Sequence, residues 1–349
     1  MRATVLHGAG HVRLDEVPDP SILLATDAVV RVVAACVCGS DLWPYRGIAP
    51  AAAPRRIGHE FVGVVEDAGG DVRTVRRGDF VIAPFAVSDG ICAHCRNGVH
   101  TSCVQGGWWG SPDAAGLPVD GGQGEYVRVP LADGTLVRTP DVPDAELVPS
   151  LLTLSDVMGT GHHAALAAGV GPGSSVVVVG DGAVGLCAVL AARRLGAERI
   201  VAMSRHEPRQ RLATEFGATD IVAERGVAGV AVVLDLLDGV GADAVLECVG
   251  TRESMQQALD ATRPGGRVGY VGVPHGGPEL PIRQMFGANI AVAGGVAPVR
   301  AYLDELLPEV LDGSLQPGRV FDLELPLAEV AEAYAAMDER RSIKSLLRP

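Results

Sequence analysis

A run of four valines that ends in a glycine-rich turn is the sequence feature that most restricts the fold. Ser175–Val179 is short, apolar and β-branched, which is typical of a strand buried on both faces. The turn Gly180–Gly185 reads G-D-G-A-V-G, and a helical pattern over Ala183–Leu195 begins inside it. Glycines at this spacing permit a tight turn, close approach of a pyrophosphate to the backbone, and close packing of the helix on the strand. The context therefore favours a dinucleotide-binding βαβ unit over an ordinary strand–helix turn.

Further strands and helices alternate after this unit. A strand is expected at Arg199–Met203, a helix at Glu207–Phe216, and two more strands at Ala244–Cys248 and Arg267–Val271. Such alternation predicts a parallel, doubly wound sheet, that is, an α/β Rossmann domain. The expected cofactor-binding residues lie in the glycine turn and after the later strands: Gly180, Gly182, Ala183, Val184, Gly185, Ser204, Arg205, Val249 and Val273.

The end of the second strand indicates which nucleotide is bound. An NAD site usually carries an acid about 20 residues after the glycine motif, to bind the ribose 2′-hydroxyl. Here Ser204 and Arg205 follow the strand, and no carboxylate ends it, although Glu207 lies close by. Ser204 can donate to a 2′-phosphate and Arg205 can pair with it through its planar fork. NADP(H) is therefore expected in preference to NAD(H).

The sequence before and after the predicted Rossmann domain has a different pattern of apolar residues. Short valine-rich runs separated by Gly, Pro and Asp predict a loop-rich β domain, with strands at Ala28–Val33, Phe61–Glu66, Phe80–Ala83 and Glu125–Val129. Near the end, helices are expected at Val299–Leu311 and Leu327–Met337, followed by a closing strand at Ser342–Leu347. We expect this strand to return to the first domain. The predicted domains are thus a β-rich one, residues 1–155 with 292–349, and a Rossmann one, residues 156–291.

Three separated residues form a candidate zinc site. Cys38 lies in an early loop, His59 precedes a predicted strand, and Asp156 stands just before the nucleotide-binding unit. Each alone would more often be structural. Together they supply the three protein ligands that a catalytic zinc needs beside an open position.

A second cluster consists of cysteines at short spacing. Cys92, Cys95 and Cys103 follow Asp89, and this pattern in an intracellular chain indicates a zinc lobe with the carboxylate as fourth ligand. The alternative is a lobe that folds without metal. Two zinc ions per chain are therefore expected.

Charge and hydropathy argue against nucleic-acid-binding, membrane-spanning and secreted proteins. A net charge of −13 argues against a nucleic-acid binder, whose surface would be basic. No apolar run reaches the ~18 residues of a membrane span. The chain start turns polar too early for a signal peptide, so a cytoplasmic location is expected.

In order and spacing these motifs resemble the zinc-dependent alcohol dehydrogenases of the medium-chain family, over essentially the whole chain. Asp156 with Ser204 and Arg205 is most similar to the bacterial NADP-dependent secondary alcohol dehydrogenases. The resemblance implies a GroES-like catalytic domain beside the Rossmann domain, and a homotetramer or a dimer. It also implies roles for residues: Cys38, His59 and Asp156 as catalytic zinc ligands, Glu60 as a fourth ligand in some states, Ser40 as the first proton-relay hydroxyl, and Thr160 near the nicotinamide.

The expected reaction is reversible hydride transfer between an alcohol and NADP⁺, giving an aldehyde or ketone. Trp43 stands where many relatives have the histidine that ends the proton relay. Trp108 and Trp109, together with Trp43, are candidates for the wall of an apolar substrate pocket, or else packing residues. Three alternatives remain: a polyol or sugar dehydrogenase on the same scaffold, a zinc-free quinone or enoyl reductase, against which the ligand set argues, and a non-catalytic NADPH-binding protein.

Overall fold

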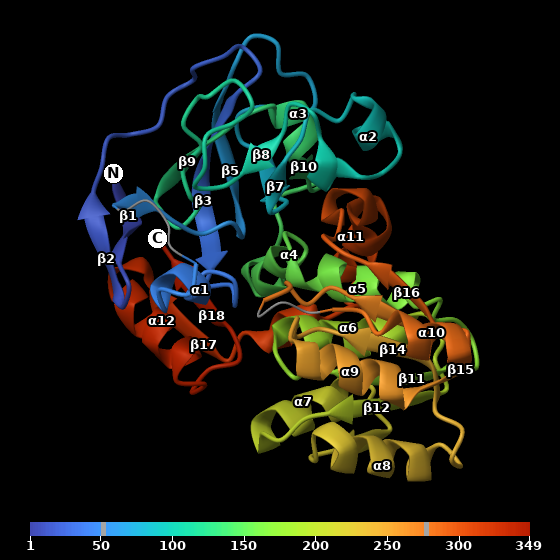
Figure 1. Cartoon of the computed structure of the whole chain (residues 1–349). Helices are drawn as coiled ribbons and strands as arrows, with labels where there is room; N and C mark the ends of the chain where they lie inside the picture. The colour runs from blue at the N-terminus through green and yellow to red at the C-terminus, as the bar shows by residue number, and fades with distance from the viewer. Residues whose placement is uncertain (50–53, 276–278) are drawn as a thin grey trace. The chain divides into compact units, whose positions relative to one another are not determined.

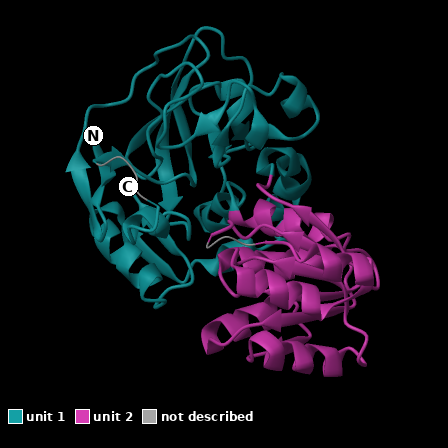
Figure 2. Cartoon of the chain, viewed as in Figure 1, with its two compact units in different colours: residues 1–156, 298–349 teal, residues 157–297 magenta. Residues whose placement is uncertain are grey.

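A computed structural model describes residues 1–49, 54–275 and 279–349 of the chain (Figure 1). The chain divides into two compact units (Figure 2). Unit 1 comprises Met1–Asp156 and Pro298–Pro349, and unit 2 comprises Val157–Ala297. Within the described ranges no helix has the length and apolar character needed to cross a membrane.

Unit 2 is built on a six-stranded, wholly parallel sheet of order β13-β12-β11-β14-β15-β16. Its strands are β11 (Ser175–Val179), β12 (Arg199–Met203), β13 (Asp220–Val222), β14 (Ala242–Glu247), β15 (Thr262–Tyr270) and β16 (Ala291–Gly294). Its helices are α5 (Val157–Ala167), α6 (Ala183–Arg194), α7 (Glu207–Phe216), α8 (Gly226–Leu236), α9 (Arg252–Ala261) and α10 (Ile282–Ala288). The predicted parallel doubly wound sheet is confirmed, and β11, β12 and α7 have the predicted bounds.

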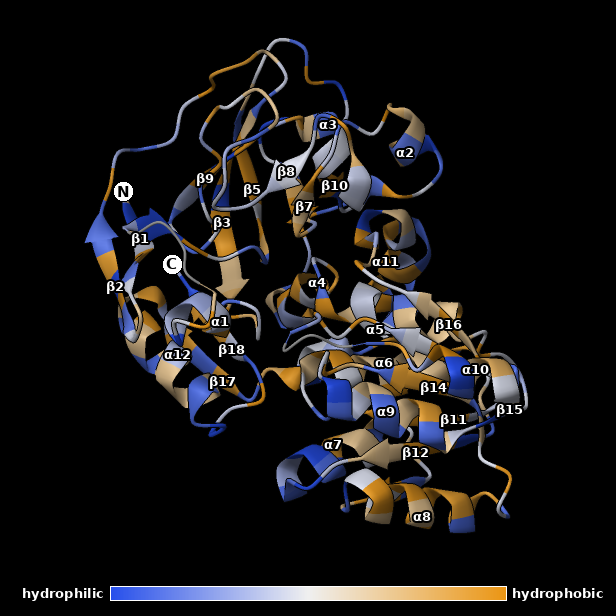
Figure 3. Cartoon of the chain, viewed as in Figure 1, coloured by the Kyte–Doolittle hydropathy of each residue, from blue (hydrophilic) through white to orange (hydrophobic). Residues whose placement is uncertain are grey.

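The strand order explains where a ligand can approach this sheet. From β11 the chain winds outward through β12 to β13, whereas β14 lies on the other side of β11 and leads to β15 and β16. The crevice between β11 and β14 is therefore a topological switch point, the usual ligand position in such sheets. The valines of β11 are buried, as their sequence predicts, and Figure 3 shows the central strands in hydrophobic colours.

Unit 1 contains the predicted β-rich, GroES-like domain. Its largest sheet has the order β10-β6-β5-β3-β18-β17, with β9 also paired to β3, beside small sheets β2-β1-β4 and β7-β8. The strands are β1 (Arg2–Gly8), β2 (His11–Glu16), β3 (Ala28–Cys36), β4 (Arg55–Arg56), β5 (Phe61–Ala68), β6 (Phe80–Ala83), β7 (Ala86–Val87), β8 (Gly107–Trp108), β9 (Tyr126–Val129), β10 (Val137–Arg138), β17 (Leu323–Pro326) and β18 (Ser345–Arg348). The helices are α1 (Leu42–Tyr45), α2 (Ala93–Arg96), α3 (Ala132–Thr135), α4 (Val148–Thr153), α11 (Leu303–Leu311) and α12 (Val330–Asp338).

The pairing of β3 with β5 positions the candidate site. The two strands are antiparallel, with Ala35 opposite Phe61. The loop that leaves β3 and the segment that enters β5 therefore emerge at the same edge of the sheet. This edge is where Cys38 and His59 lie, although 20 intervening positions separate them in the chain.

The closing strand returns to unit 1, as predicted. β18 pairs antiparallel with β3, so that Leu346 lies opposite Cys36, and parallel with β17. It begins at Ser345 rather than at Ser342. The reason is that the Asp322 carboxylate accepts the backbone N–H groups of Ile343 and Lys344, which takes this stretch out of the ladder.

Several other element boundaries differ from the sequence prediction by a few residues, and two of them show how the local backbone is organised. The helix expected from Val299 begins with a 3₁₀ turn, Val299–Tyr302, and becomes α-helical only at Leu303. β14 ends at Glu247, one residue before the predicted Cys248. The buried Glu247 carboxylate accepts the backbone N–H groups of Val249 and Gly250, which organises a turn at this point.

The glycines of the turn after β11 predict contrasting effects on stability. A Cβ at Gly185 would lie 2.0 Å from the backbone oxygen of Gly180, whereas a Cβ at Gly182 would meet nothing within 4 Å. Gly185→Ala should lower the free energy of unfolding by about 3 kcal/mol, since backbone must move to admit the methyl group. The matched variant Gly182→Ala should cost less than about 1 kcal/mol. Urea unfolding without nucleotide measures both, and equal losses would contradict the packing described.

Candidate active site and zinc lobe

Four ionisable side chains meet at the edge where β3 ends and β5 begins. One ligand atom from each of Cys38, His59, Glu60 and Asp156 lies within 4.8 Å of the others. His59 Nε2 is 3.5 Å from Asp156 Oδ2, and Cys38 Sγ is 3.7 Å from the same oxygen. The structure thus brings together the three predicted zinc ligands and the glutamate implied as a fourth.

Asp41 fixes the orientation of the His59 ring. Asp41 Oδ1 lies 3.2 Å from His59 Nδ1, and its Oδ2 accepts the backbone N–H of Cys38 at 3.0 Å. Nε2 is therefore the ring nitrogen that faces Asp156. Burial lowers the pKa of His59, but the negative charges of Asp41 and Cys38 outweigh it and raise this pKa well above its ordinary value. Sequence reasoning missed Asp41, although its place three residues after Cys38 was a usable signal.

Glu60 is held by a buried ion pair with the only lysine of the chain. Lys344 Nζ lies 2.7 Å from Glu60 Oε1 and also donates to the carbonyl oxygen of Val37. Glu60 and Lys344 are 0% and 1% exposed, so this charge pair is fully removed from water. Glu60 Oε2 is buried and, in the described chain, has no hydrogen-bond partner. Burial raises the pKa of Glu60, and the Lys344 ammonium opposes that rise.

This donor set fits a zinc ion. A thiolate, an imidazole and a carboxylate are the ligand types zinc takes, and three of them leave a position open for chemistry. Burying several anionic groups side by side is costly without a nearby cation. The buried, unpartnered Oε2 of Glu60 adds a further oxygen that an ion could satisfy. Cys38, His59 and Asp156 would hold the ion, and Glu60 would be available as a fourth ligand.

A hydroxyl group also reaches this cluster. Ser40 Oγ donates to Cys38 Sγ at 3.2 Å and lies 3.5 Å from His59 Nε2. Trp43 is half-buried in α1 of the same unit, and Thr160 is buried in α5 of unit 2. Ser40, the residue implied as the first hydroxyl of the proton relay, therefore lies against the ligand group.

The structure corrects the expectation for Trp109. Its side chain is 7% exposed in the core of unit 1, packs edge-on against Phe61, and donates its indole N–H to the carbonyl oxygen of Pro84 at 2.9 Å. Trp109 is therefore a packing residue in the core of unit 1. Trp108 is 45% exposed instead, and its ring stacks on Phe85, which lies edge-on to His59 with ring centroids 6.5 Å apart. Sequence reasoning missed Phe85 because no spacing marks it.

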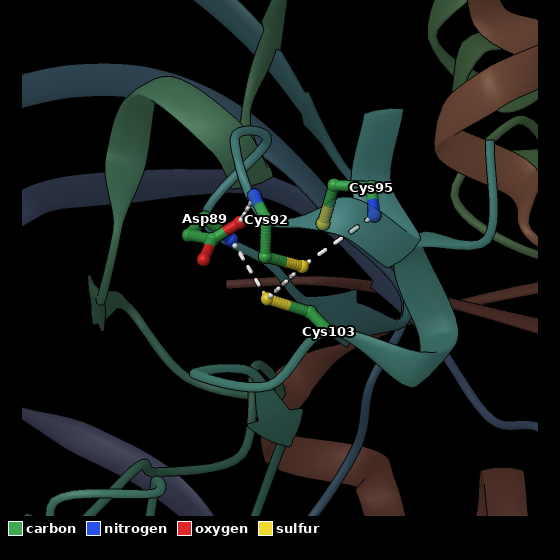
Figure 4. A group of neighbouring side chains, drawn as sticks. All are labelled: Asp89, Cys92, Cys95 and Cys103. Carbon is green, nitrogen blue, oxygen red and sulfur yellow. Dashed lines mark hydrogen bonds between the residues drawn. The ribbon is translucent and has the colours of Figure 1, made fainter. Parts of the chain in front are cut away.

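Asp89, Cys92, Cys95 and Cys103 form a second group whose ligand atoms lie within 4.8 Å of one another (Figure 4). Asp89 N–H donates to Cys103 Sγ at 3.2 Å, and Cys95 N–H donates to Cys92 Sγ at 3.5 Å. Burial favours a higher pKa for Asp89, but the N–H groups of Cys92 and Ile91 bond its Oδ1 and bring the pKa to about 2. A carboxylate beside three sulfurs is a donor set that fits zinc.

The glycine turn of unit 2 has the geometry of an anion-binding loop. Gly180 has φ +117°, which only glycine adopts readily, and Gly182 is the N-cap of α6 with open space where a side chain would point. Backbone N–H groups at this helix start are therefore accessible to a phosphate. Val249 and Val273, which follow β14 and β15, are 38% and 51% exposed.

The predicted 2′-phosphate contacts are only partly available. Ser204 is 2% exposed and donates its hydroxyl to Asp181 Oδ2 at 2.9 Å, so it has no proton left for a phosphate. Asp181, from the glycine turn, thus supplies a carboxylate at the end of β12 that the strand's own sequence lacks. Arg209 Nη1 lies 3.2 Å from Asp181 Oδ1. Burial of the Asp181 carboxyl favours a higher pKa, but the positive charge of Arg209 outweighs this effect and lowers the pKa of Asp181. Arg205 is exposed.

Comparisons with known proteins agree with this geometry. Residues 25–141 match the alcohol dehydrogenase GroES-like domain, and residues 183–312 match the zinc-binding dehydrogenase domain. A probable zinc-binding alcohol dehydrogenase of Mycobacterium tuberculosis is 37% identical over all of this chain and 89% of its own length. Formaldehyde dismutase of Pseudomonas putida is 29% identical, and the match covers 100% of this chain and 97% of that protein. Among solved structures, alcohol dehydrogenase TADH from Thermus sp. ATN1 superposes with a TM-score of 0.91 at 35% identity, covering 100% of this chain and 99% of its own.

Fold, ligand clusters and relatives together place the protein in one class, the zinc-binding oxidoreductases with a GroES-like and a Rossmann domain. The chain belongs to the zinc-dependent medium-chain alcohol dehydrogenase family.

The donor set of Asp89, Cys92, Cys95 and Cys103 leads to a prediction about metal content. We expect zinc in this group and in the Cys38 group, and Asp89→Ala should lose only the first ion, because the two ligand sets share no residue. His94→Ala is the matched control, since His94 is an exposed residue of the same lobe outside the ligand set. Elemental analysis after gel filtration measures both variants. Equal zinc in Asp89→Ala and the wild type would remove Asp89 from the ligand set.

Proposed function

We propose that the protein catalyses the reversible oxidation of an alcohol to an aldehyde or ketone with NADP⁺ as the hydride acceptor. The observation that carries this proposal is the largely buried group of Cys38, His59, Glu60 and Asp156 with a serine hydroxyl against it. A zinc-free quinone or enoyl reductase has no use for such a group. A non-catalytic nucleotide-binding protein would not need it either.

In the proposed reaction, the metal, the cofactor and Ser40 have separate roles. When bound, zinc supplies Lewis acidity that lowers the pKa of the alcohol, and the nicotinamide supplies the hydride-accepting carbon. Ser40 Oγ, which can both accept and donate, takes the hydroxyl proton and passes it outward. The alcohol thereby loses one proton and one hydride and becomes a carbonyl compound. Because the Trp43 side chain cannot relay a proton, Ser40 would pass it to water, to a ribose hydroxyl of the bound cofactor, or along another route.

The aromatic pair Phe85 and Trp108 supports a substrate with an apolar substituent. Phe85 presents its ring edge-on to His59, and Trp108 extends that apolar surface with partial exposure. A polyol or sugar would instead need hydrogen-bonding groups around the carbinol carbon. We therefore propose simple alcohols as substrates, with polyols as the alternative that a substrate panel discriminates.

The choice of NADP(H) rests on Arg205. It is exposed at the end of β12, and the carboxylate of Asp181, which would repel a 2′-phosphate, is compensated by Arg209. A planar guanidinium binds a phosphate in bidentate fashion. Asp181 is also the group that would bind a ribose 2′-hydroxyl if NAD(H) were preferred, so direct titration separates the two possibilities.

We also propose that the protein is a cytoplasmic homo-oligomer, a tetramer or a dimer. Strand β16 is the edge of the sheet in unit 2, and neighbouring α10 exposes Ile282 and Phe286 at 65% and 85%. An open parallel edge beside exposed large apolar side chains favours association with a second copy. Sedimentation velocity measures the assembly.

The proposed ligands give the most direct functional prediction. Cys38→Ala and Asp156→Ala should each lower kcat at least about 10³-fold, because zinc contributes several kcal/mol at about 1.4 kcal/mol per factor of ten. NADPH binding should persist. Cys36→Ala is the matched control, since it removes a nearby thiol that is also buried but lies outside the ligand group. Activity of Asp156→Ala close to that of Cys36→Ala would overturn the proposed site.

Cofactor preference gives a second prediction. Arg205→Ala should weaken NADPH binding at least about tenfold and leave NADH binding unchanged, since only NADPH carries the 2′-phosphate. Arg211→Ala is the control, because Arg211 pairs with Glu207 on the same helix, α7. Fluorescence titration of both nucleotides provides the measurement. Tighter NADH than NADPH binding by the wild type would assign Asp181 to the ribose and reject the NADP proposal.

A further inference from the structure

A single buried amide connects the two segments that carry Cys38 and His59 with the C-terminal helix α12. Gln123 is 0% exposed and follows two glycines in the stretch before β9. Its Nε2 donates to the carbonyl oxygen of Cys36 at 2.9 Å and lies 3.4 Å from Asp41 Oδ2. Its Oε1 accepts the hydroxyl of Tyr334, from α12, at 3.0 Å.

The hydrogen-bonding partners determine which way this amide points. The Cys36 carbonyl and the Asp41 carboxylate can only accept hydrogen bonds, so both must face the amino group of Gln123. The carbonyl end of Gln123 is then left for Tyr334, which must donate. All polar atoms of the Gln123 side chain are used in this one orientation, and Tyr334, itself 0% exposed, fixes it.

The absence of a side chain at Gly58 makes room for the side chain of Gln123. Gly58, the residue before His59, has φ +97°, and a Cβ there would lie 2.4 Å from Gln123 Cγ. Gly122 N–H donates to the Gly58 carbonyl oxygen at 2.8 Å, which ties the two segments together. The Gln123 side chain therefore lies directly against the backbone that presents His59.

We propose that Gln123 and Tyr334 are positioning residues for the metal site, acting through Asp41 on His59. Tyr334 orients Gln123, Gln123 donates to Asp41, and Asp41 holds His59 Nδ1 so that Nε2 points at Cys38 and Asp156. A carboxylate that receives a hydrogen bond on one oxygen keeps the other fixed toward the imidazole. The inference rests on the proposed function, since it assumes that this group holds zinc.

The test compares zinc affinity in the folded chain with stability in its absence. Gln123→Met should weaken zinc binding at the Cys38 group about tenfold, the lower end of the range for partners of metal ligands. Tyr334→Phe should cause a smaller loss in the same direction. Competition with a chelator measures the affinity, and the d–d bands of the Co²⁺-substituted protein should shift in both variants.

Two internal controls separate positioning from structure. Tyr45→Phe removes a hydroxyl that is not a hydrogen-bond partner of the Gln123 side chain, from a ring whose centroid lies 5.4 Å from that of Tyr334, and this variant should bind zinc as the wild type does. The lobe at Asp89 should keep its zinc in every variant. Wild-type affinity and an unshifted Co²⁺ spectrum in both Gln123→Met and Tyr334→Phe would overturn this inference, whatever their stability in urea. If the wild type itself held no zinc at Cys38, the proposed function would fail instead.

Discussion

The concentration of charge around Cys38, His59, Glu60 and Asp156 is the constraint on which unit 1 depends. Four ionisable groups within 4.8 Å of one another cannot all be stable in the interior unless opposite charge and hydrogen bonds compensate them. Part of the compensation comes from the far end of the chain, where Lys344 on the approach to β18 pairs with Glu60. The pairing of β18 with β3 thus holds a counter-charge in place as well as closing the sheet. The remaining negative charge is what a divalent cation would neutralise.

Much of the fold could be predicted because it depends on local patterns. The valines of Ser175–Val179 need burial on both faces whatever surrounds them, so the strand and its parallel sheet were predictable. Steric demands made Gly180 and Gly185 predictable too, since any side chain there would strain the turn or meet backbone. The ligand clusters were predictable from residue type and spacing, because thiolates and imidazoles in such patterns have few other uses.

What could not be predicted depends on contacts between distant segments. Nothing near Lys344 in the sequence shows that it will meet Glu60, and Gln123 reaches Asp41 only through the pairing of its segment with that of Gly58. Trp109 and Trp108 are adjacent, yet one is core and the other is exposed, because alternate residues of a short extended segment face opposite sides. Ser204 was expected to donate to a phosphate, but its hydroxyl instead donates a hydrogen bond to Asp181, which comes from the glycine turn after β11.

Zinc K-edge X-ray absorption on the protein as purified tests the central claim most directly, because it reports which atoms surround the metal. The Cys38 group offers one sulfur and the Asp89 lobe offers three, so filling both sites gives an average of two sulfurs per zinc, with imidazole scattering from His59. An average of three sulfurs without an imidazole signal would mean that only the lobe holds zinc. That result would contradict the account of Cys38, His59 and Asp156 as the catalytic metal site.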